Sequence, residues 1–376
     1  MPCHTRGANA GRPSSTRARG LMAIACALLA AGLLSTPSHA QVPQSAWDLL
    51  ARLATDQDTP STPAERASSP LPADASRVVY LVRPSDTDAR IDHFLKDHYV
   101  MYDRAVPQNG KLFVFLPGTW GWPAVYQFVV AEAARAGYKA IGLEYPDDEA
   151  DPKASAVEQI CAGNTGLDCA AQVRSVRIWG GTADGVTVSP ANGLEHRIAR
   201  LLAYLAAAHP SEGWGTFLAA GRVHWSLVAV GGHSQGAGMA AFLAKRLAVA
   251  RVALWSGPTD YMPAAHGFAS WLRAASATSP DRWYALVHRD EAGSRVFLAA
   301  YGALGIPGTP AVADASVPRD THQFMVTLPP RGGTEGPVMP AIASADHGSV
   351  ATDLRTPLDA LGRPVYAAVW RALIGP

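Results

Sequence analysis

The segment that decides the fold is VGGHSQGAG, residues Val230–Gly238, in which Ser234 stands between Gly232 and Gly236. The apolar run SLVAV leads into it, and an apolar pattern with helical spacing, GMAAFLAKRLA, continues from it. A sharp turn from a strand into a helix leaves little room for side chains two residues before and after its central serine. The G-x-S-x-G pattern therefore predicts a strained turn that presents the Ser234 hydroxyl at the carboxyl end of a strand, above a helix amino terminus.

Apolar strand-like runs alternate with helical patterns on both sides of this turn. The strand candidates are VVYLV (Val78–Val82), HYVMYD (His98–Asp103), KLFVF, YKAIGLEY, SLVAVGG, RVALWSG, WYALVH and QFMVTL. The helix candidates are PAVYQFVVAEAARAGY, the face formed by Leu194, Ile198, Leu201, Leu202 and Leu205, GMAAFLAKRLA and RPVYAAVWRAL. Strands that alternate with helices in this way predict an α/β fold with a mainly parallel central sheet and helices on both faces.

With its serine turn in this context, the chain resembles the α/β-hydrolase superfamily of serine hydrolases over residues 78–376. The resemblance implies the α/β-hydrolase fold, with a serine, an acid and a histidine in that chain order at the ends of successive strands. It implies Ser234 as the nucleophile, and this chemistry requires no cofactor and no metal. Residues 147–224 are too many for one helical crossover, so we expect an excursion from the sheet that can overhang the site.

The resemblance places the histidine of the triad in the loop after the last strand. Four histidines follow the serine turn, and we predict His347, in the polar segment ASADHGSVATD, as the general base. His322 precedes QFMVTL and so lies at the wrong end of that strand. His288 lies inside WYALVH, where a packed histidine is expected, and His266 follows an earlier strand.

The acid of the triad is expected after the WYALVH strand, where the chain reads HRDEAG. Asp290 comes first after the strand, and we predict that it orients His347. Glu291, the next residue, is the local alternative. Asp260, after RVALWSG, is a second alternative, because some members of the superfamily carry the acid one strand earlier.

An oxyanion hole requires two backbone amides, and the resemblance implies where they come from. One belongs to Gln235, directly after the nucleophile. The other lies in LPGTWGWP, the loop after KLFVF, where we predict Thr119 with Trp120 as the alternative. Trp120 and Trp122 flank Gly121 in that loop, and Trp255 ends a strand. The sequence leaves two roles open for these tryptophans: walls of an apolar substrate pocket, or packing in the core or at its rim.

The N-terminal residues 1–40 have the layout of a secretory signal. Four arginines precede the short apolar run Leu21–Leu34, and SHA, which ends at Ala40, supplies small residues for cleavage. The run is shorter than the ~20 residues of a membrane span, so we expect no stable span after signal removal. Residues 41–77, rich in Pro, Ser, Ala and Asp, are expected to form a linker or loosely packed arm. Export favours a disulfide between Cys161 and Cys169.

Composition limits the classes of function. The chain has 376 residues, is 48% hydrophobic and carries a formal net charge of +1 without a basic run, which argues against nucleic-acid binding. The sequence predicts an exported serine hydrolase, periplasmic or extracellular, that cleaves small-molecule carboxylic esters through an acyl-enzyme on Ser234. The alternatives are an amidase or peptidase with the same triad, or a non-catalytic binding protein on a lapsed hydrolase fold.

Overall fold

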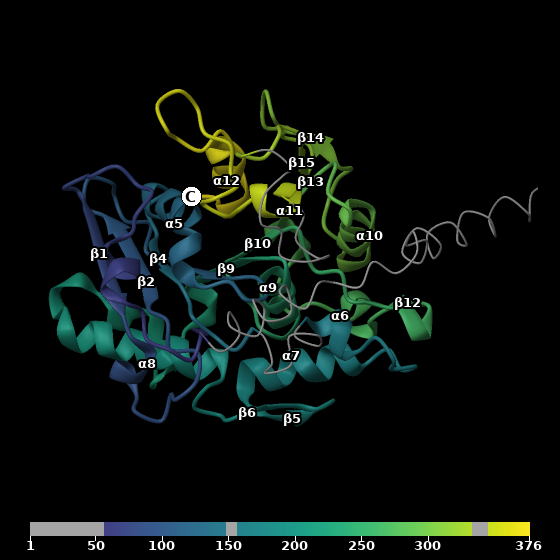
Figure 1. Ribbon diagram of the computed structural model, residues 1–376, viewed down its shortest axis with the longest axis horizontal. Coiled ribbons are helices and arrows are strands. Elements are labelled where there is room, and N and C mark those ends of the chain that lie inside the picture. Colours follow the sequence, from purple (N-terminus) through teal and green to yellow (C-terminus); the bar gives the residue numbers. More distant parts are fainter. Residues whose placement is uncertain (1–55, 148–155, 333–344) are drawn as a thin grey trace, which may run out of the picture. The chain divides into compact units, whose positions relative to one another are not determined.

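The computed structural model describes residues 56–147, 156–332 and 345–376, so the predicted signal segment lies outside the described residues. Within these ranges, nine strands form one sheet in the order β1-β2-β4-β3-β9-β10-β13-β15-β14 (Figure 1). Their bounds are Arg77–Val82 (β1), His98–Asp103 (β2), Leu112–Leu116 (β3), Lys139–Gly142 (β4), Val228–His233 (β9), Arg251–Trp255 (β10), Trp283–His288 (β13), Ala311–Val312 (β14) and Gln323–Val326 (β15).

The sheet is mainly parallel, as the sequence predicted. Strand β2 runs antiparallel to both β1 and β4, and all pairs from β4 to β14 are parallel. All residues of β2, β3, β4 and β9 are buried. Strands covered on both faces bury every side chain, which is why they stand out in the sequence as continuous apolar runs.

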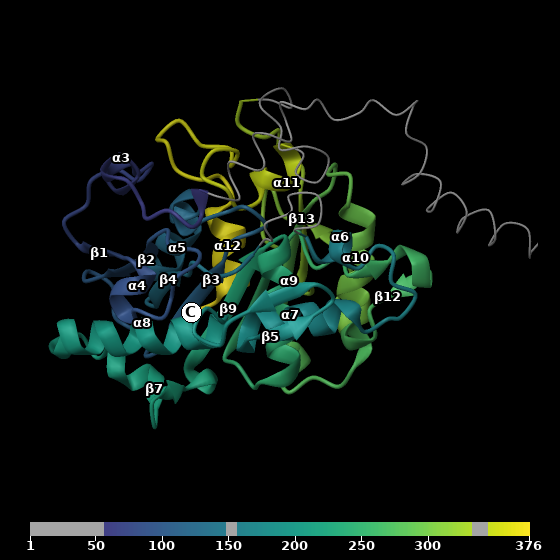
Figure 2. The same ribbon diagram turned by 60° about the horizontal axis from the view of Figure 1, so that its bottom comes forward.

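Helices cover both faces of this sheet (Figures 1 and 2). Their bounds are Pro63–Ala67 (α3), Pro84–Thr87 (α4), Gln127–Arg135 (α5), Val157–Ile160 (α6), Cys169–Trp179 (α7), Leu194–Ala208 (α8), Gln235–Arg246 (α9), Ser294–Leu304 (α10), Ala345–Ser349 (α11) and Ala367–Ile374 (α12). Helices α5 and α12 pack one core, which includes Phe128 and Trp370. Helices α7, α8, α9 and α10 pack the other, which includes Leu201 and Phe242.

The predicted excursion between β4 and β9 contains helices rather than one crossover. Its described part holds α6, α7 and α8 and two small hairpins, β5–β6 (Gly181–Ala183 and Val186–Val188) and β7–β8 (Leu218–Ala219 and Arg222–Val223). The predicted disulfide between Cys161 and Cys169 is present, and it links the end of α6 to the first residue of α7. A third hairpin, β11–β12 (Tyr261–Met262 and Gly267–Phe268), follows β10.

The described half of the N-terminal arm is held against the domain by specific contacts. Arg66 Nη2 lies 2.7 Å from Asp97 Oδ1, and the buried Lys96 donates to Glu65 at 2.9 Å. Glu65 also closes a capping box with Thr62 at the start of α3. The composition predicted a linker or loosely packed arm over residues 41–77, and the described part of that segment carries ion pairs and a capped helix.

Candidate active site

Ser234 lies on a strained turn between β9 and α9. Its backbone has φ 55° and ψ −119°, in a region that residues with a side chain rarely occupy. A Cβ atom on Gly236 would overlap the carbonyl oxygens of Leu116 and Pro117, and one on Gly232 would overlap the backbone of Gly236. The two glycines of the G-x-S-x-G pattern are therefore required by the close approach of the turn to β3. Ser234 itself remains partly exposed.

A buried carboxylate–imidazole pair lies at the same edge of the sheet. Glu291, just after β13, places Oε2 2.5 Å from Nδ1 of His347, which is in α11 after β15. Both side chains are almost completely buried. Oε1 of Glu291 accepts two more hydrogen bonds, from the Ser256 hydroxyl at 2.6 Å and from the His288 amide at 2.9 Å. The carboxylate is thus held by three donors, and one of them is the imidazole.

The prediction that Asp290 contacts His347 is corrected by this geometry. Asp290 is exposed and bonds Arg289 instead, with 2.9 Å between Oδ1 and Nε. The hydrogen bond from Arg289 lowers the pKa of Asp290. The adjacent Glu291 turns inward because Ser256 and the backbone at the end of β13 supply donors that a buried carboxylate needs.

Asp260, the other alternative acid, is engaged elsewhere. It is fully buried, and its Oδ2 accepts hydrogen bonds from Arg174 Nε at 2.8 Å and from Trp271 Nε1 at 2.7 Å. The ion pair to Arg174 ties the loop after β10 to α7. This aspartate serves the packing of the excursion and does not contact His347.

The remaining histidines lie where the sequence placed them. His288 is buried, and its Nε2 lies 3.1 Å from the Leu328 carbonyl. His266 is exposed in a left-handed turn. The imidazole of His322 stacks on Tyr284 at 3.9 Å, and its Nδ1 lies 3.0 Å from the carbonyl of Trp283, at the start of β13. Of the four histidines after the serine turn, only His347 contacts Glu291 through its imidazole in the described part of the chain, whereas His288 does so through its backbone amide.

The predicted oxyanion loop lies directly against the serine turn. A Cβ atom on Gly118 would come within 3.1 Å of Ser234 Cβ. The loop forms a turn in which the Gly121 amide donates to the Gly118 carbonyl at 2.8 Å, with Trp120 at φ 59°. Among the described residues, the amides of Thr119 and Gln235 donate to no protein group. Gln235 opens α9, and first-turn amides lack partners within a helix.

The three tryptophans have different surroundings. Trp255 is fully buried, and its ring packs edge-on against Phe115 at 5.5 Å, so it belongs to the core rather than to a substrate pocket. Trp122 is partly exposed, 6.0 Å from Lys96 Nζ. Trp120 is 6% exposed, and its indole nitrogen has no hydrogen-bond partner among the described residues.

Sequence reasoning missed Ser256, which fixes the orientation of Glu291. This serine follows β10 with φ 45° and is fully buried. The signal that identifies it is its position: it is a polar residue at the carboxyl end of β10, and β10 lies between β9 and β13 in the sheet. Parallel neighbours bring such residues to one edge of a sheet, and Ser256 and Glu291 meet there.

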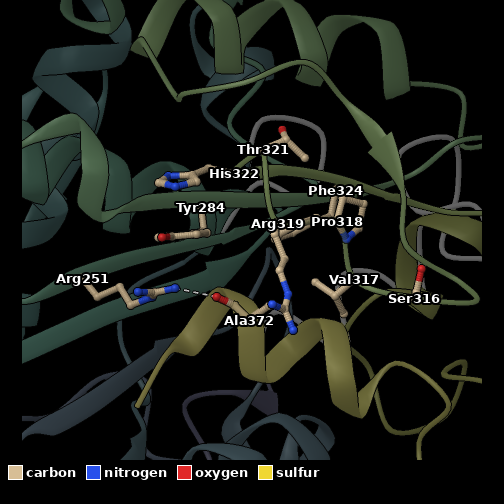
Figure 3. A pocket seen from close by; sticks show the side chains of 10 residues that line it. All are labelled: Arg251, Tyr284, Ser316, Val317, Pro318, Arg319, Thr321, His322, Phe324 and Ala372. Atoms are coloured by element: carbon tan, nitrogen blue, oxygen red, sulfur yellow. Dashed lines mark hydrogen bonds between the residues drawn. The ribbon is translucent and has the colours of Figure 1, made fainter.

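A cavity of about 620 Å³ lies away from this cluster (Figure 3). Its walls include Arg251, at the start of β10, and Tyr284, near the start of β13, whereas Ser234 follows the carboxyl end of β9. The guanidinium of Arg251 stacks over the Tyr284 ring at 3.7 Å and donates to the Leu373 carbonyl at 2.5 Å. The cavity therefore lies at the opposite edge of the sheet from the serine turn.

Among residues 56–147, 156–332 and 345–376, no cluster of three or more His, Cys, Asp or Glu side chains could hold a metal ion. In the same ranges, no helix combines the length and the apolar character that a bilayer span needs.

Solved structures similar to this chain include the following three. EstE5 soaked with p-nitrophenyl butyrate is 14% identical, with 82% of this chain and 87% of that chain covered and a TM-score of 0.35. A tributyrin phosphonate-inhibited esterase B from Lactobacillus rhamnosis is 12% identical, with coverage of 76% and 85% and a TM-score of 0.37. A bacterial heroin esterase is 14% identical, with coverage of 79% and 86% and a TM-score of 0.36. No protein-family model and no curated protein matches the chain.

The chain has the α/β-hydrolase fold. This conclusion depends on the mainly parallel sheet, on the strained serine turn between β9 and α9, and on the order of Ser234, Glu291 and His347 along the chain. The three residues follow β9, β13 and β15, and these strands lie within one stretch of the sheet order, separated only by β10. The fold defines a class of protein and leaves the reaction to the site.

Proposed function

We propose that this protein is an exported serine hydrolase that cleaves carboxylic esters through an acyl-enzyme on Ser234. The buried contact between Glu291 and His347 carries the proposal, because an oriented imidazole is what activates a serine hydroxyl. The positive φ of Ser234 supports it, since strain of this kind is concentrated at functional sites.

The first half-reaction forms the acyl-enzyme. Nδ1–H of His347 donates to Glu291, so the lone pair of Nε2 is left to accept a proton. Ser234 Oγ attacks the ester carbonyl carbon while His347 Nε2 takes the hydroxyl proton, and the carbonyl π electrons move to oxygen. The tetrahedral intermediate collapses, its carbon–oxygen bond to the alcohol breaks, and Nε2 returns the proton to the leaving alkoxide.

The second half-reaction releases the acid. Water gives a proton to His347 Nε2 and adds to the acyl carbon, and collapse expels Ser234 Oγ, which regains that proton. In both steps Glu291 stabilises the imidazolium and remains a carboxylate. The amides of Gln235 and Thr119 hold the oxyanion, and each donor of this type contributes about 3–4 kcal/mol to lowering the barrier.

Export is the second part of the proposal. It depends on the signal layout of residues 1–40, and the disulfide between Cys161 and Cys169 supports it because such bonds persist in oxidising compartments. Expression of the full-length gene product followed by intact-mass analysis of the secreted fraction tests it. We expect a chain that begins at Gln41, and retention of the full precursor in the cytoplasm contradicts export.

Hydrolysis is tested with matched substrates. Short-chain p-nitrophenyl esters and the corresponding p-nitroanilides should be compared on the wild type and on Ser234→Ala. We expect turnover of esters that Ser234→Ala abolishes, with the variant folded as judged by circular dichroism. Faster cleavage of anilides would assign the same residues to amide hydrolysis. Equal rates in wild type and variant would overturn Ser234 as the nucleophile.

A further inference from the structure

A buried chain of hydrogen bonds runs behind the serine turn. The Gly118 amide donates to Tyr126 Oη at 3.2 Å, Tyr126 Oη lies 3.1 Å from His233 Nδ1, and His233 Nε2 lies 2.9 Å from the carbonyl oxygen of His347. All four residues are buried. His233 is the residue before Ser234, so the chain passes directly beside the nucleophile.

The direction of each hydrogen bond in this network follows from its terminal acceptor, the carbonyl oxygen of His347. The His347 carbonyl can only accept, so His233 Nε2 must carry a hydrogen. Burial lowers the pKa of His233 well below its ordinary value, which keeps the imidazole neutral and its Nδ1 an acceptor. Tyr126 therefore donates its hydroxyl hydrogen to Nδ1, and its oxygen is free to accept from Gly118. Each group uses complementary donor and acceptor atoms, so the network is satisfied without a charge.

This hydrogen-bond network connects the three parts of the site that must keep fixed positions relative to one another. Gly118 belongs to the oxyanion loop, His233 to the serine turn, and the His347 carbonyl to the short helix α11. The imidazole of His347 bonds Glu291 at Nδ1 and packs against the rings of His233, at 4.6 Å, and Phe297, at 5.7 Å. Contacts to the ring alone would still let the main chain of His347 shift. The bond from His233 to the carbonyl removes that freedom.

We propose that His233 and Tyr126 are positioning residues that hold the main chain of His347 and the oxyanion loop in register with Ser234. This inference rests on the proposed function of the site. Neither side chain is assigned a contact with substrate. Their contribution is geometric, and displacement of a reacting group by ~1 Å costs roughly 100-fold in rate.

The hydrogen-bond network also limits which backbone amide of the loop can donate to an oxyanion. The Gly118 amide is occupied by Tyr126, so it is not available to an oxyanion. The next amide along the loop is that of Thr119, which supports Thr119 as the donor. Because the Tyr126 bond fixes the peptide of Gly118, it also fixes the direction in which the following amide points.

Two substitutions at His233 distinguish the contributions of the hydrogen bonds that its two ring nitrogens make. In His233→Gln the side-chain NH₂ reaches the position of Nε2 and can donate to the His347 carbonyl. In His233→Asn the amide reaches only the position of Nδ1, so the bond to His347 is lost. We expect kcat of His233→Gln to stay within about threefold of the wild type, and kcat of His233→Asn to fall by about 10- to 100-fold with KM unchanged within about twofold.

Tyr126→Phe provides a second, independent variant, with Tyr138→Phe as its control. Tyr138 is also buried and donates to the Ile374 carbonyl at 3.0 Å, far along the chain from the site. Both variants lose a buried hydroxyl, so we expect similar decreases in Tm. Only Tyr126→Phe should lower kcat, by about 10-fold or more, because only it releases the oxyanion loop and His233.

The rate of reaction with a fluorophosphonate, measured per folded molecule, separates this inference from the function it rests on. If Ser234→Ala abolishes labelling while His233→Asn and Tyr126→Phe label at the wild-type rate, the positioning role is wrong and the nucleophile stands. Equal kcat values for His233→Gln and His233→Asn also contradict it. A wild type that neither labels nor turns over esters overturns both proposals. Slow labelling by His233→Asn with normal labelling by His233→Gln supports both.

Discussion

Glu291 and His347 are 56 residues apart in the sequence and meet through a contact of 2.5 Å between Oε2 and Nδ1. The other oxygen of the carboxylate accepts hydrogen bonds from Ser256 and from the His288 amide. The orientation of Glu291 therefore does not depend on the imidazole alone. A buried carboxylate needs hydrogen-bond donors, and Glu291 has three. Under the proposed function, this contact assigns the stabilisation of a charged imidazole to Glu291 and not to its exposed neighbour Asp290.

Substitution of the two adjacent acids should therefore give opposite results. Glu291→Gln keeps the shape of the side chain but no longer stabilises the imidazolium, so we expect kcat/KM to fall by about 100- to 10,000-fold. Asp290→Asn only breaks an exposed pair with Arg289, and its kcat/KM should remain within about twofold of the wild type. Steady-state kinetics on one ester measures both, and a large loss confined to Asp290→Asn would contradict the assignment.

Gly236, two residues after Ser234, is expected to be sensitive to substitution for a steric reason. Gly236→Ala places a methyl group against the carbonyl oxygens of Leu116 and Pro117, so the turn or β3 must move. We expect a loss of about 1–3 kcal/mol or more in the free energy of unfolding, together with loss of activity. Gly302→Ala is the control. That glycine lies in α10 with open space around it, and alanine should raise stability by up to about 1 kcal/mol. Urea unfolding of both variants checks the pair, and equal effects would contradict the steric account.

Asp353 predicts how stability depends on pH. Its carboxylate accepts the first amides of α5, from Gln127 at 2.8 Å and Phe128 at 2.9 Å. Burial raises its pKa from 3.8 to about 7, despite these hydrogen bonds. The folded state therefore binds a proton more tightly than the unfolded state. The stabilising contribution is complete below about pH 4 and is lost as the pH rises to about 7.

Asp353→Asn does not titrate and so isolates this contribution. The free energy of unfolding of the wild type, minus that of Asp353→Asn, should decrease between pH 4 and pH 7 by about 1.4 kcal/mol per pH unit at most, and then remain constant. Chemical denaturation at several pH values measures the difference. A difference that does not change over this range, or that increases, would show that Asp353 does not have a raised pKa.

The disulfide should stabilise the folded state by an amount that depends on the length of the loop that it closes. Cys161 and Cys169 are eight residues apart, and a loop of this length corresponds to about 2–3 kcal/mol of unfolded-state entropy. We expect Cys161→Ala with Cys169→Ala to lower the free energy of unfolding by that amount, and a reductant to lower that of the wild type alone. If the reductant has no effect on the wild type, the bond is absent or contributes nothing.

The sequence predicted most of the sheet well, because its central strands are buried on both faces. VVYLV, HYVMYD, KLFVF and WYALVH all became strands at or within one residue of the expected positions. The excursion was harder to predict, because α7 buries Arg174 and Arg177 among its apolar residues. Buried arginines interrupt the helical pattern of apolar residues, and their partners lie far away in sequence.

The site was predicted less completely, for a local reason. Ser234, Gln235 and Thr119 follow from the turn and from the order of strands. The choice between Asp290 and Glu291 depends on the conformation of two residues after β13, which apolar periodicity does not determine. Asp290 forms an ion pair with Arg289 at the surface, and Glu291 accepts a hydrogen bond from the buried Ser256. These partners become visible only when β10 and β13 are known to be neighbours.

The most direct test of the central claim is the reaction of the mature protein with a serine-directed fluorophosphonate, measured by intact mass beside Ser234→Ala. The account predicts one adduct on the wild type, located at Ser234 by peptide mapping, and none on the variant. An adduct that persists on Ser234→Ala would contradict Ser234 as the nucleophile. A folded wild type that takes no adduct would contradict an activated serine and favour a binding protein on this fold.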